Sequence, residues 1–308
     1  MKVTLISTVY NEANNIGLFL DSLSMQTRLP DEVVICDAGS TDGTAEILKD
    51  FASKFSCSFN IIVEEGNRSH GRNTAIRHAT HEIIAGTDAG CVLDPHWLER
   101  IISPFEKDSS VDVVSGFYSA CGKTWFEKCV AVATLSTKGV DPETFLPSTR
   151  SIAFRRSAWE DVGGLPEHLE YAEDTKFGLD LRAAGKRFVF ASDALVYWRP
   201  RATLLQVFNQ SYNYARGNAE ARILFFNYVR IHVRYLVWLV LSVGLFISPW
   251  FFALWIPAVV PYWLKWSLAG WRASQDLRSL LVTPWIKLIV DIGQFAGFWS
   301  GLCHSRQT

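Results

Sequence analysis

The chain has 308 residues, which is enough for one large domain or for one domain with an appendage. Its 30 Lys and Arg nearly balance 31 Asp and Glu, so the total charge does not point to nucleic acid as a partner. Acidic residues fall mostly before position 185, whereas the last third is rich in aromatic and aliphatic residues, and most Trp residues follow Trp198. This asymmetry predicts a soluble N-terminal part and a membrane-associated C-terminal part.

The cysteine pattern and the N-terminus indicate a cytosolic setting for the soluble part. The six Cys residues form no CxxC pair and no zinc-like grouping with His, so we expect reduced thiols. The apolar run Met1–Ser7 is too short for the core of a signal peptide.

Short apolar runs alternate with helical patterns along the first half of the chain. The predicted strands are Val3–Val9, Glu32–Asp37, Ile61–Glu64, Glu82–Thr87 and Val111–Gly116. The predicted helices between them are Asn14–Gln26, Asp42–Phe55, Gly71–Ala79 and one that opens near Asp94. This alternation predicts an α/β fold with a mainly parallel sheet and helices on both faces.

Polar clusters follow three of these strands directly. They are Tyr10–Glu12, Asp37–Thr44 and Asp88–Gly90. Ligands of such sheets bind beyond the carboxyl ends of the strands, so we expect the three clusters to line one cleft. The second and third clusters also have an ordinary structural explanation, because Asp, Ser and Thr at these positions cap helices and form turns.

The chain between residues 126 and 184 carries a second group of functional candidates. We expect a helix over Phe126–Leu135, a long polar loop over Ser136–Arg150, a turn at Gly163-Gly164 and a helix over Asp174–Ala184. Glu173-Asp174 opens the last helix. The helix dipole favours acidic residues there, and one of these carboxylates could also act as a general base.

The C-terminal third predicts a membrane-attached region. No charged residue occurs from Tyr235 to Leu264, and basic residues flank this stretch on both sides. Three Pro residues within it favour two short helices over one long helix, so we expect a transmembrane hairpin over about 232–266 with both flanks cytoplasmic. Lys287 and Asp291 form an i,i+4 pair in the last apolar stretch, which favours an interfacial amphipathic helix over about 278–302. The alternative, a buried helix of a soluble core, does not suit an uncharged run of this length.

The motifs together, in their order and spacing, resemble glycosyltransferase family 2, whose catalytic domain has the GT-A fold. The matching segments are Ser7–Glu12, Asp37–Thr44, Arg72-Asn73, Asp88–Gly90, Phe154–Trp159 with Gly163-Gly164, and Glu173-Asp174. The resemblance covers roughly residues 3 to 217, and more narrowly the chain resembles membrane-bound members that build bacterial exopolysaccharide repeats, of the succinoglycan type. It implies a GT-A-like domain over 1–220, followed by membrane-associated helices over 221–308.

The resemblance also implies roles for individual residues. Asp174 would be the catalytic base, Glu173 would position it or the acceptor, and Asp88 would be the first acid of the DxD element and the metal ligand. The residues implied in donor binding are Thr8, Tyr10, Glu12, Asp37, Arg72, Asn73, Asp88, Arg150, Arg155, Gln210 and Arg216.

Two positions depart from the family pattern. The second DxD acid aligns with Gly90, and a histidine that often ends a later strand aligns with Trp198. Both changes remove possible ligands of the divalent cation, Mg²⁺ or Mn²⁺, that the resemblance implies. The ion would then be held by Asp88, phosphates and water, or arginines would carry more of the charge on the leaving group.

The activity that the resemblance implies is an inverting transfer of a sugar from a nucleotide-diphosphate donor, with a UDP-sugar as the first expectation. The acceptor would be a polyprenyl-linked sugar or a polysaccharide, and the location would be the inner membrane with the catalytic domain in the cytoplasm. The small membrane part favours single addition over processive synthesis.

Two other functions compete with sugar transfer. The first is a non-catalytic nucleotide-sugar-binding partner of a membrane complex, which Gly90 and Trp198 motivate and Glu173-Asp174 opposes. The second, a nucleotide-dependent oxidoreductase, is discounted because no G-x-G-x-x-G turn follows the first strand.

Overall fold

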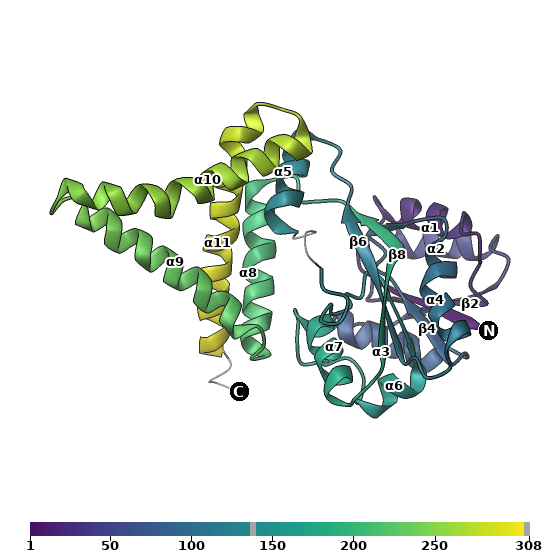
Figure 1. Cartoon of the computed structure of the whole chain (residues 1–308). Helices are drawn as coiled ribbons and strands as arrows, with labels where there is room; N and C mark the ends of the chain where they lie inside the picture. Colours follow the sequence, from purple (N-terminus) through teal and green to yellow (C-terminus); the bar gives the residue numbers. More distant parts are fainter. Residues whose placement is uncertain (136–139, 305–308) are drawn as a thin grey trace. The chain divides into compact units, whose positions relative to one another are not determined.

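The computed structural model describes residues 1–135 and 140–304, which divide into two compact units. Within the described residues, the first unit comprises 1–119 and 140–198, and the second comprises 120–135 and 199–304 (Figure 1). The break at Trp198 lies ahead of the predicted domain boundary at 220, because helix α8 (Leu204–Glu220) packs along helix α11 (Arg278–His304) in the second unit. Residues 136–139 of the predicted loop lie outside the described residues.

The first unit is built on an eight-stranded sheet with the strand order β3-β2-β1-β4-β7-β6-β8-β5. Its strands are β1 (Val3–Val9), β2 (Glu32–Asp37), β3 (Ser58–Val63), β4 (Ile83–Gly86), β5 (Cys91–Leu93), β6 (Val113–Ala120), β7 (Ile152–Arg155) and β8 (Phe188–Trp198). The α/β fold class is confirmed, and the first two predicted strands match β1 and β2 in both bounds.

The sheet is parallel in one half and contains antiparallel pairs in the other. Strand β1 pairs in parallel with β2 and β4, and β2 with β3. In contrast, β7 runs antiparallel to β4 and β6, and β5 runs antiparallel to β8. The parallel half is the part where strands and helices alternate regularly along the chain, as crossover connections require.

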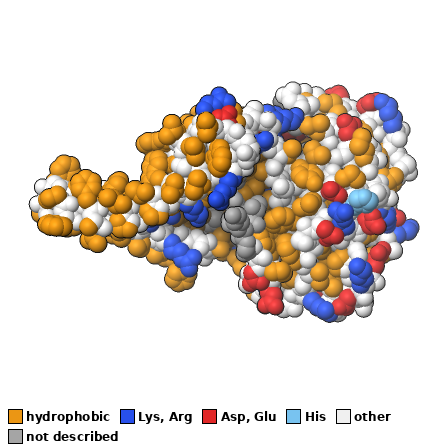
Figure 2. Space-filling view, turned by 45° about the horizontal axis from the view of Figure 1, so that its top comes forward, with side chains coloured by type: hydrophobic (Ala, Val, Ile, Leu, Met, Phe, Trp, Pro, Cys, Tyr) orange, Lys and Arg blue, Asp and Glu red, His pale blue; other side chains and the backbone are white. Residues whose placement is uncertain are grey.

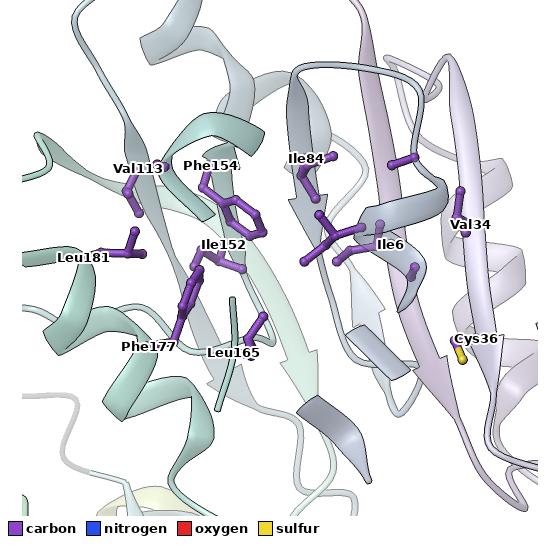
Figure 3. Packing of buried hydrophobic residues seen from close by; sticks show 14 residues of the cluster. Ile6, Val34, Cys36, Ile84, Val113, Ile152, Phe154, Leu165, Phe177 and Leu181 are labelled. Atoms are coloured by element: carbon purple, nitrogen blue, oxygen red, sulfur yellow. The ribbon is translucent and has the colours of Figure 1, made fainter. Parts of the chain in front are cut away.

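Helices cover the sheet of the first unit, and the hydrophobic core lies beneath them. These helices are α1 (Ile16–Ser24), α2 (Thr44–Ala52), α3 (Arg68–His78), α4 (Trp97–Lys107), α6 (Arg156–Asp161) and α7 (Glu173–Ala183). In one buried hydrophobic cluster, Ile6 and Ile84 of the parallel strands lie together with Phe154 of β7 and Phe177 of α7 (Figure 3). The two phenylalanine rings meet edge to face, with their centroids 5.5 Å apart. This packing fixes α3 and α7, the two helices that carry the candidate site.

The second unit is helical. It contains α5 (Trp125–Thr134), α8, α9 (Phe225–Gly244), the short 3-10 helix η1 (Pro249–Phe251), α10 (Phe252–Ser274) and α11. Thr124 and Glu127 start α5 with a reciprocal capping box. The predicted hairpin over 232–266 falls on α9 and α10, and the predicted amphipathic helix over 278–302 falls on α11.

Two of the described helical segments are long and apolar enough to cross a membrane, judged by length and composition. They are Pro249–Ser274 and Arg278–His304. An apolar C-terminal region of this kind accompanies the α/β unit as the sequence predicts, and it is consistent with a membrane region.

Helices α8 and α11 pack with their backbones in direct contact. A methyl group added at Gly297 would lie 2.0 Å from the carbonyl oxygen of Tyr212, which is far closer than atoms can approach. Equivalent contacts recur every four residues along both helices, at Gly293 with Phe208 and at Gly301 with Arg216. The two helices are therefore parallel, and small residues are required along this seam, as in closely packed membrane helices.

We expect the substitution Gly297→Ala to destabilise the second unit by about 1–3 kcal/mol, because the two backbones must move apart. The measurement is thermal unfolding of the purified protein in detergent. Gly17→Ala in α1 is the matched control, since nothing lies within 4 Å of an added methyl group there. The control should be neutral or slightly stabilising, since Ala is a better helix former than Gly. Equal melting temperatures for both variants would contradict the packing.

Candidate active site

The loops that follow β1 and β2 are joined by hydrogen bonds at the carboxyl edge of the sheet. The Asn11 amide N–H donates to Ser40 Oγ at 2.9 Å, and Asn11 Oδ1 accepts the Thr41 N–H at 2.9 Å. The Glu12 N–H donates to Thr44 Oγ1 at 2.9 Å. The parallel register makes this possible, because Val9 lies opposite Asp37. The first two predicted clusters therefore lie side by side.

Asp37 is a buried carboxylate at the end of β2 that uses only one of its oxygens. Its Oδ1 accepts the Ser40 N–H at 2.9 Å and the Ser40 hydroxyl at 2.7 Å. Its Oδ2 is buried and has no hydrogen-bond partner within the described part of the chain. A buried acceptor without a partner costs free energy, so this oxygen suits an N–H or O–H group of a ligand.

Arg72 on α3 joins the end of β4 to the start of α7. Its Nη2 donates to Asp88 Oδ1 at 2.8 Å, and its Nη1 donates to Glu173 Oε1 at 2.9 Å. The side chain is buried, with 7% of its surface exposed. The preceding Gly71 lets α3 approach β1, since a methyl group there would lie 2.9 Å from Thr8 Cγ2. One guanidinium group thus holds two predicted site acids that are 85 positions apart in the sequence.

The charges around Arg72 shift the pKa values of both acids, in opposite directions. Burial raises the pKa of Asp88, but the positive charges of Arg72, Arg150 and Arg68 outweigh it and hold the pKa below its usual value. Burial and the neighbouring Asp174 carboxylate raise the pKa of Glu173, although Arg72 opposes them. Asp88 is therefore an anion at neutral pH.

Asp174 lies at the first turn of α7, beside Glu173. Its Oδ2 accepts a hydrogen bond from Ser148 Oγ at 3.0 Å, and its Oδ1 accepts the Thr175 N–H at 2.7 Å. Ala172, just before this pair, has φ 65° and ψ 13°. This left-handed conformation costs a residue with a side chain roughly 1–2 kcal/mol, so the surrounding structure holds the turn against strain.

Arg150 makes cation–π contacts with two aromatic rings of the same unit. Its guanidinium carbon is 5.4 Å from the ring centre of Tyr118 and 5.5 Å from that of Trp198. Its Nη1 also donates to Ser148 Oγ at 3.2 Å, the hydroxyl that contacts Asp174. The tryptophan that replaces the expected histidine thus contacts a cation whose charge reaches Asp88.

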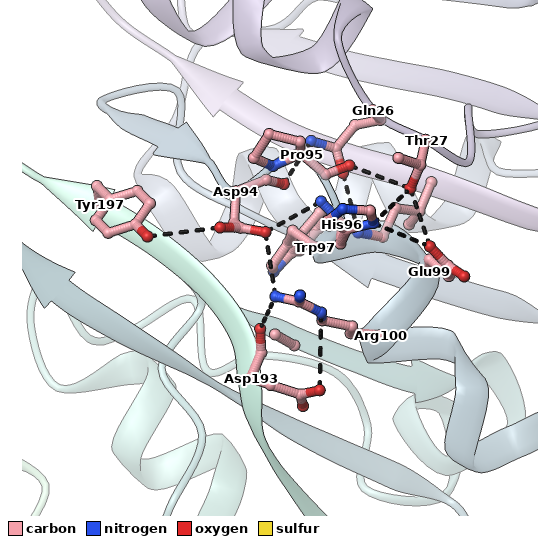
Figure 4. A network of polar contacts seen from close by, with 12 residues as sticks. Gln26, Thr27, Asp94, Pro95, His96, Trp97, Glu99, Arg100, Asp193 and Tyr197 are labelled. Carbon is pink, nitrogen blue, oxygen red and sulfur yellow. Dashed lines mark hydrogen bonds and ion pairs between the residues drawn. The ribbon is translucent and has the colours of Figure 1, made fainter.

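The protein ligands for a divalent cation are few. No group of three or more His, Cys, Asp or Glu side chains suited to a metal is found among the described residues. Burial raises the pKa of the Cys91 thiol to about 12, with a further contribution from the nearby Asp88 carboxylate. Asp94 accepts hydrogen bonds from the His96 N–H at 3.1 Å and from Arg100 at 3.2 Å, which ties it to α4 (Figure 4). Among the described residues, the predicted ligand Asp88 is a carboxylate of the kind that holds a cation together with phosphate oxygens, and this role stays a prediction.

Two of the predicted donor-binding residues, Asn73 and Arg155, have contacts outside the group of side chains around Arg72. The side-chain amide of Asn73 accepts from Trp159 and the Leu165 N–H, and donates to Leu165 O and Glu167. All its hydrogen-bonding positions are used, so its contacts support the loop before α7. Arg155 pairs with Ile83 at the amino end of β4, the opposite end from Asp88, because β7 is antiparallel to β4.

Two of the predicted donor-binding residues, Gln210 and Arg216, belong to the second unit. Gln210 and Arg216 lie on α8, where Gln210 donates to Tyr214 Oη at 3.2 Å and Arg216 pairs with Glu220 at 2.7 Å. Their role toward a donor stays a prediction.

Tyr10 and Glu12 lie in the first unit, in the loop that follows β1. Tyr10 is 61% exposed, and Glu12 contacts Asn15.

Sequence reasoning did not single out three residues that the structure places at this site. Arg68 adds positive charge near Asp88, the ring of Tyr118 contacts the guanidinium group of Arg150, and Ser148 contacts Asp174. Ser148 lies in the polar loop that was expected to carry function, which was the available signal. Arg68 and Tyr118 are recognisable only once α3 and β6 are placed in space.

The chain is similar to known proteins in its sequence and in its fold. The family model described as glycosyl transferase family 2 matches residues 4–161, and the one described as glycosyl transferase family group 2 matches residues 83–286. The chain belongs to glycosyl transferase family 2. It is therefore a glycosyltransferase, and the fold and family expected from its motifs are confirmed.

Individual relatives are similar over about two thirds to three quarters of their length. The chain is 29% identical to glycosyltransferase AglE of Haloferax volcanii over 228 residues, covering 72% of this chain and 74% of the relative. It is 28% identical to the succinoglycan biosynthesis protein ExoA of Rhizobium meliloti, covering 68% and 67%. Together with the apolar C-terminal helices, the likeness to this family 2 member indicates a membrane association.

A solved structure shares the fold. The mannosyltransferase PcManGT of Pyrobaculum calidifontis, solved in complex with GDP-Man and Mn²⁺, aligns with a TM-score of 0.57 at 20% identity, over 95% of this chain and 86% of its own. At this identity the likeness establishes the GT-A-like fold.

We expect Arg72→Met to reduce the free energy of unfolding at pH 7.5 by about 3–5 kcal/mol, because two acids then lose their buried partner. The loss should shrink toward pH 5. In the native protein the low pKa of Asp88 gives stability that is present above the unfolded value of about 3.9 and is lost as pH falls through the folded pKa. In the variant, burial alone raises both pKa values, so protonation at acid pH restores stability.

The measurement is urea unfolding followed by tryptophan fluorescence at both pH values. Arg77→Met is the matched control on the same helix, because Arg77 is half exposed and pairs with Glu167 at the surface. The control should change stability by less than about 0.5 kcal/mol at either pH. A loss for Arg72→Met that is independent of pH would contradict the role of the two carboxylates.

Proposed function

We propose that this family 2 enzyme transfers a sugar from a nucleoside-diphosphate sugar to an acceptor hydroxyl with inversion at the anomeric carbon. The observation that carries the proposal is the linked set of charges in the first unit, in which Arg72 joins Asp88 to Glu173, and Ser148 joins Arg150 to Asp174. This set combines a carboxylate base with cations that can stabilise a leaving diphosphate.

In the proposal, the nucleoside part of the donor lies at the ends of β1 and β2. The exposed ring of Tyr10 offers a face for the base, and the unpartnered Oδ2 of Asp37 accepts a hydrogen bond from the base or the ribose. The diphosphate lies near Arg150 and Asp88. A divalent cation would be held by Asp88 together with the donor phosphates and water, and would neutralise charge on the leaving group.

The reaction needs one proton transfer and one displacement. Asp174 accepts the proton of the acceptor hydroxyl, whose oxygen forms the new bond to the anomeric carbon. The bond from that carbon to the diphosphate oxygen breaks, and the nucleoside diphosphate leaves with the electron pair. Ser148 orients Asp174 through its hydrogen bond, and Glu173 fixes the start of α7 through Arg72.

The acceptor in this proposal is a lipid-linked sugar or a glycan at a membrane surface. The apolar C-terminal helices support it, because attachment to a bilayer brings the enzyme to an acceptor that is itself in the lipid. The catalytic unit would lie on the cytoplasmic side of the inner membrane, where nucleotide sugars are made. A UDP-sugar remains the first donor to test, and GDP-sugars are included because PcManGT is solved with GDP-Man.

We expect Asp174→Asn to lower the turnover rate by about 10²–10⁴-fold while donor affinity is retained, because an amide cannot accept the proton. The measurement combines nucleoside-diphosphate release with calorimetric binding of the donor. Asp180→Asn is the matched control, since Asp180 lies on the same helix and pairs with Lys176 at the surface. Full cellular function of Asp174→Asn would favour the alternative of a non-catalytic nucleotide-sugar-binding partner.

The donor and acceptor are identified by incubating the protein in lipid with UDP-, GDP- and dTDP-sugars, with and without polyprenyl-diphosphate sugars. We expect release of nucleoside diphosphate with one nucleotide class, and faster release when the lipid acceptor is present. Mg²⁺ and Mn²⁺ are supplied in turn. No release with any donor in the presence of either ion would contradict the proposed transfer.

A further inference from the structure

Helices α9 and α10 form a hairpin with an apolar tip that no other described part of the second unit covers. The two helices converge at the tip and diverge toward α8 and α11 (Figure 1). At the tip, Phe246 is 93% exposed, Ile247 79% and Trp250 83%. Hydrophobic side chains cover the projecting arm in the space-filling view (Figure 2). A soluble protein rarely presents an apolar surface of this kind to water.

A buried charge network lies at the base of the hairpin. Asp291 of α11 is fully buried, and its Oδ2 accepts hydrogen bonds from Arg234 at 2.8 Å and from the hydroxyls of Tyr235 at 2.9 Å and Tyr262 at 2.6 Å. Lys287 lies 3.1 Å from its other oxygen. These contacts tie α9 and α10 to α11 at one level. They also mark where the charge-free part of the hairpin begins.

The chain from residue 199 onward is cationic, which suits a surface of anionic phospholipids. Residues 199–308 contain eleven Lys and Arg but only three Asp and Glu. Each of the three acids is paired with a basic side chain: Glu220 with Arg216, Asp276 with Arg278, and Asp291 with Arg234 and Lys287. The surplus of positive charge favours contact with lipid phosphates.

The charge-free arms are too short to cross a bilayer. They run from 235 to 247 in one arm and from 252 to 264 in the other, so at 1.5 Å per residue each reaches roughly 20 Å. The hydrocarbon core of a bilayer is about 30 Å thick. Because the arms also diverge toward their base, the depth that they reach is smaller still (Figure 1).

A full crossing by the longer helical segments would place charges inside the membrane. The segment Pro249–Ser274 contains Lys265, and Arg278–His304 contains Lys287 and Asp291 near its middle. Charged groups at the centre of a bilayer are costly. If the Asp291 network lies at the headgroups instead, the network stays at the surface and only uncharged residues enter the hydrocarbon.

From these observations we infer that the α9–α10 hairpin inserts into a single leaflet of an anionic phospholipid bilayer, with Arg234, Lys265 and Lys287 at the level of the lipid phosphates. The tip at Phe246–Trp250 then ends within the hydrocarbon. This inference rests on the membrane attachment of the proposed function, and it revises the predicted transmembrane hairpin to a hairpin that reaches only the first leaflet.

The test uses the full chain in vesicles of phosphatidylglycerol and phosphatidylcholine, with Ile247→Cys at the tip and Phe226→Cys at the start of α9. Both residues are 79% exposed, so neither change disturbs packing. The background carries Cys121→Ser and Cys303→Ser, because these two cysteines are exposed. A membrane-impermeant maleimide is supplied outside the vesicles or trapped inside them, and a bimane at each position is quenched by lipids labelled at known depths.

We expect the cysteine at 226 to be labelled from one side and the cysteine at 247 to be labelled from neither side. The bimane at 247 should be quenched most by lipids labelled deep in the acyl chain. Labelling of 247 from the side opposite 226 would overturn single-leaflet insertion in favour of a crossing. Labelling of both from the same side would overturn insertion altogether. Neither result depends on sugar transfer, which is measured separately as nucleoside-diphosphate release.

Discussion

The buried guanidinium of Arg72 is the interaction on which the site depends. It neutralises Asp88 and Glu173 at once, and without it both acids would lose their cation, Glu173 at a buried position and Asp88 at a partly exposed one. The same contact sets distances between three elements, because Arg72 comes from α3, Asp88 follows β4 and Glu173 opens α7. The close approach of α3 to β1 at Gly71 makes this possible. The strained turn at Ala172 is a further cost that this arrangement holds in place.

The departures from the family pattern become intelligible around Arg150. The family pattern leads us to expect an acid at Gly90 and a histidine at Trp198, so this chain has fewer possible metal ligands at these positions. Arginine side chains near Asp88 make the site more positively charged instead. Trp198 contacts Arg150, whose charge acts together with those of Arg72 and Arg68 on Asp88. A site of this composition can bind a diphosphate through guanidinium groups as well as through an ion. In the proposed function, tryptophan in place of histidine at position 198 therefore replaces a possible metal ligand with a side chain that contacts the cation Arg150.

Much of the fold was predictable from the sequence, and the failures have physical reasons. Parallel strands such as β1 and β2 are continuous apolar runs bounded by turns, so their bounds were read correctly, and their register explains why the clusters after them meet. Strands β5 and β7 have only three and four residues, too few for a periodic signal. Asn73 and Arg155 belong to the predicted donor-binding set, and the contacts that the structure gives them lie at the loop before α7 and at the far end of β4, while their role toward a donor stays a prediction. Side-chain direction, unlike strand existence, depends on partners distant in sequence.

The glycine seam between α8 and α11 has a mechanical consequence. Where side chains separate two helices, they can slide or rotate past each other by changing rotamers, but at Gly297 the backbones themselves touch and leave no such freedom. The two helices therefore move as one rod. A ligand that displaced Gln210 or Arg216 would therefore displace α8 and α11 together. The base of the α9–α10 hairpin would move with them, because Tyr235 and Tyr262 are hydrogen-bonded to Asp291 of α11. Ligand binding on α8 would then change the position of the hairpin in the lipid.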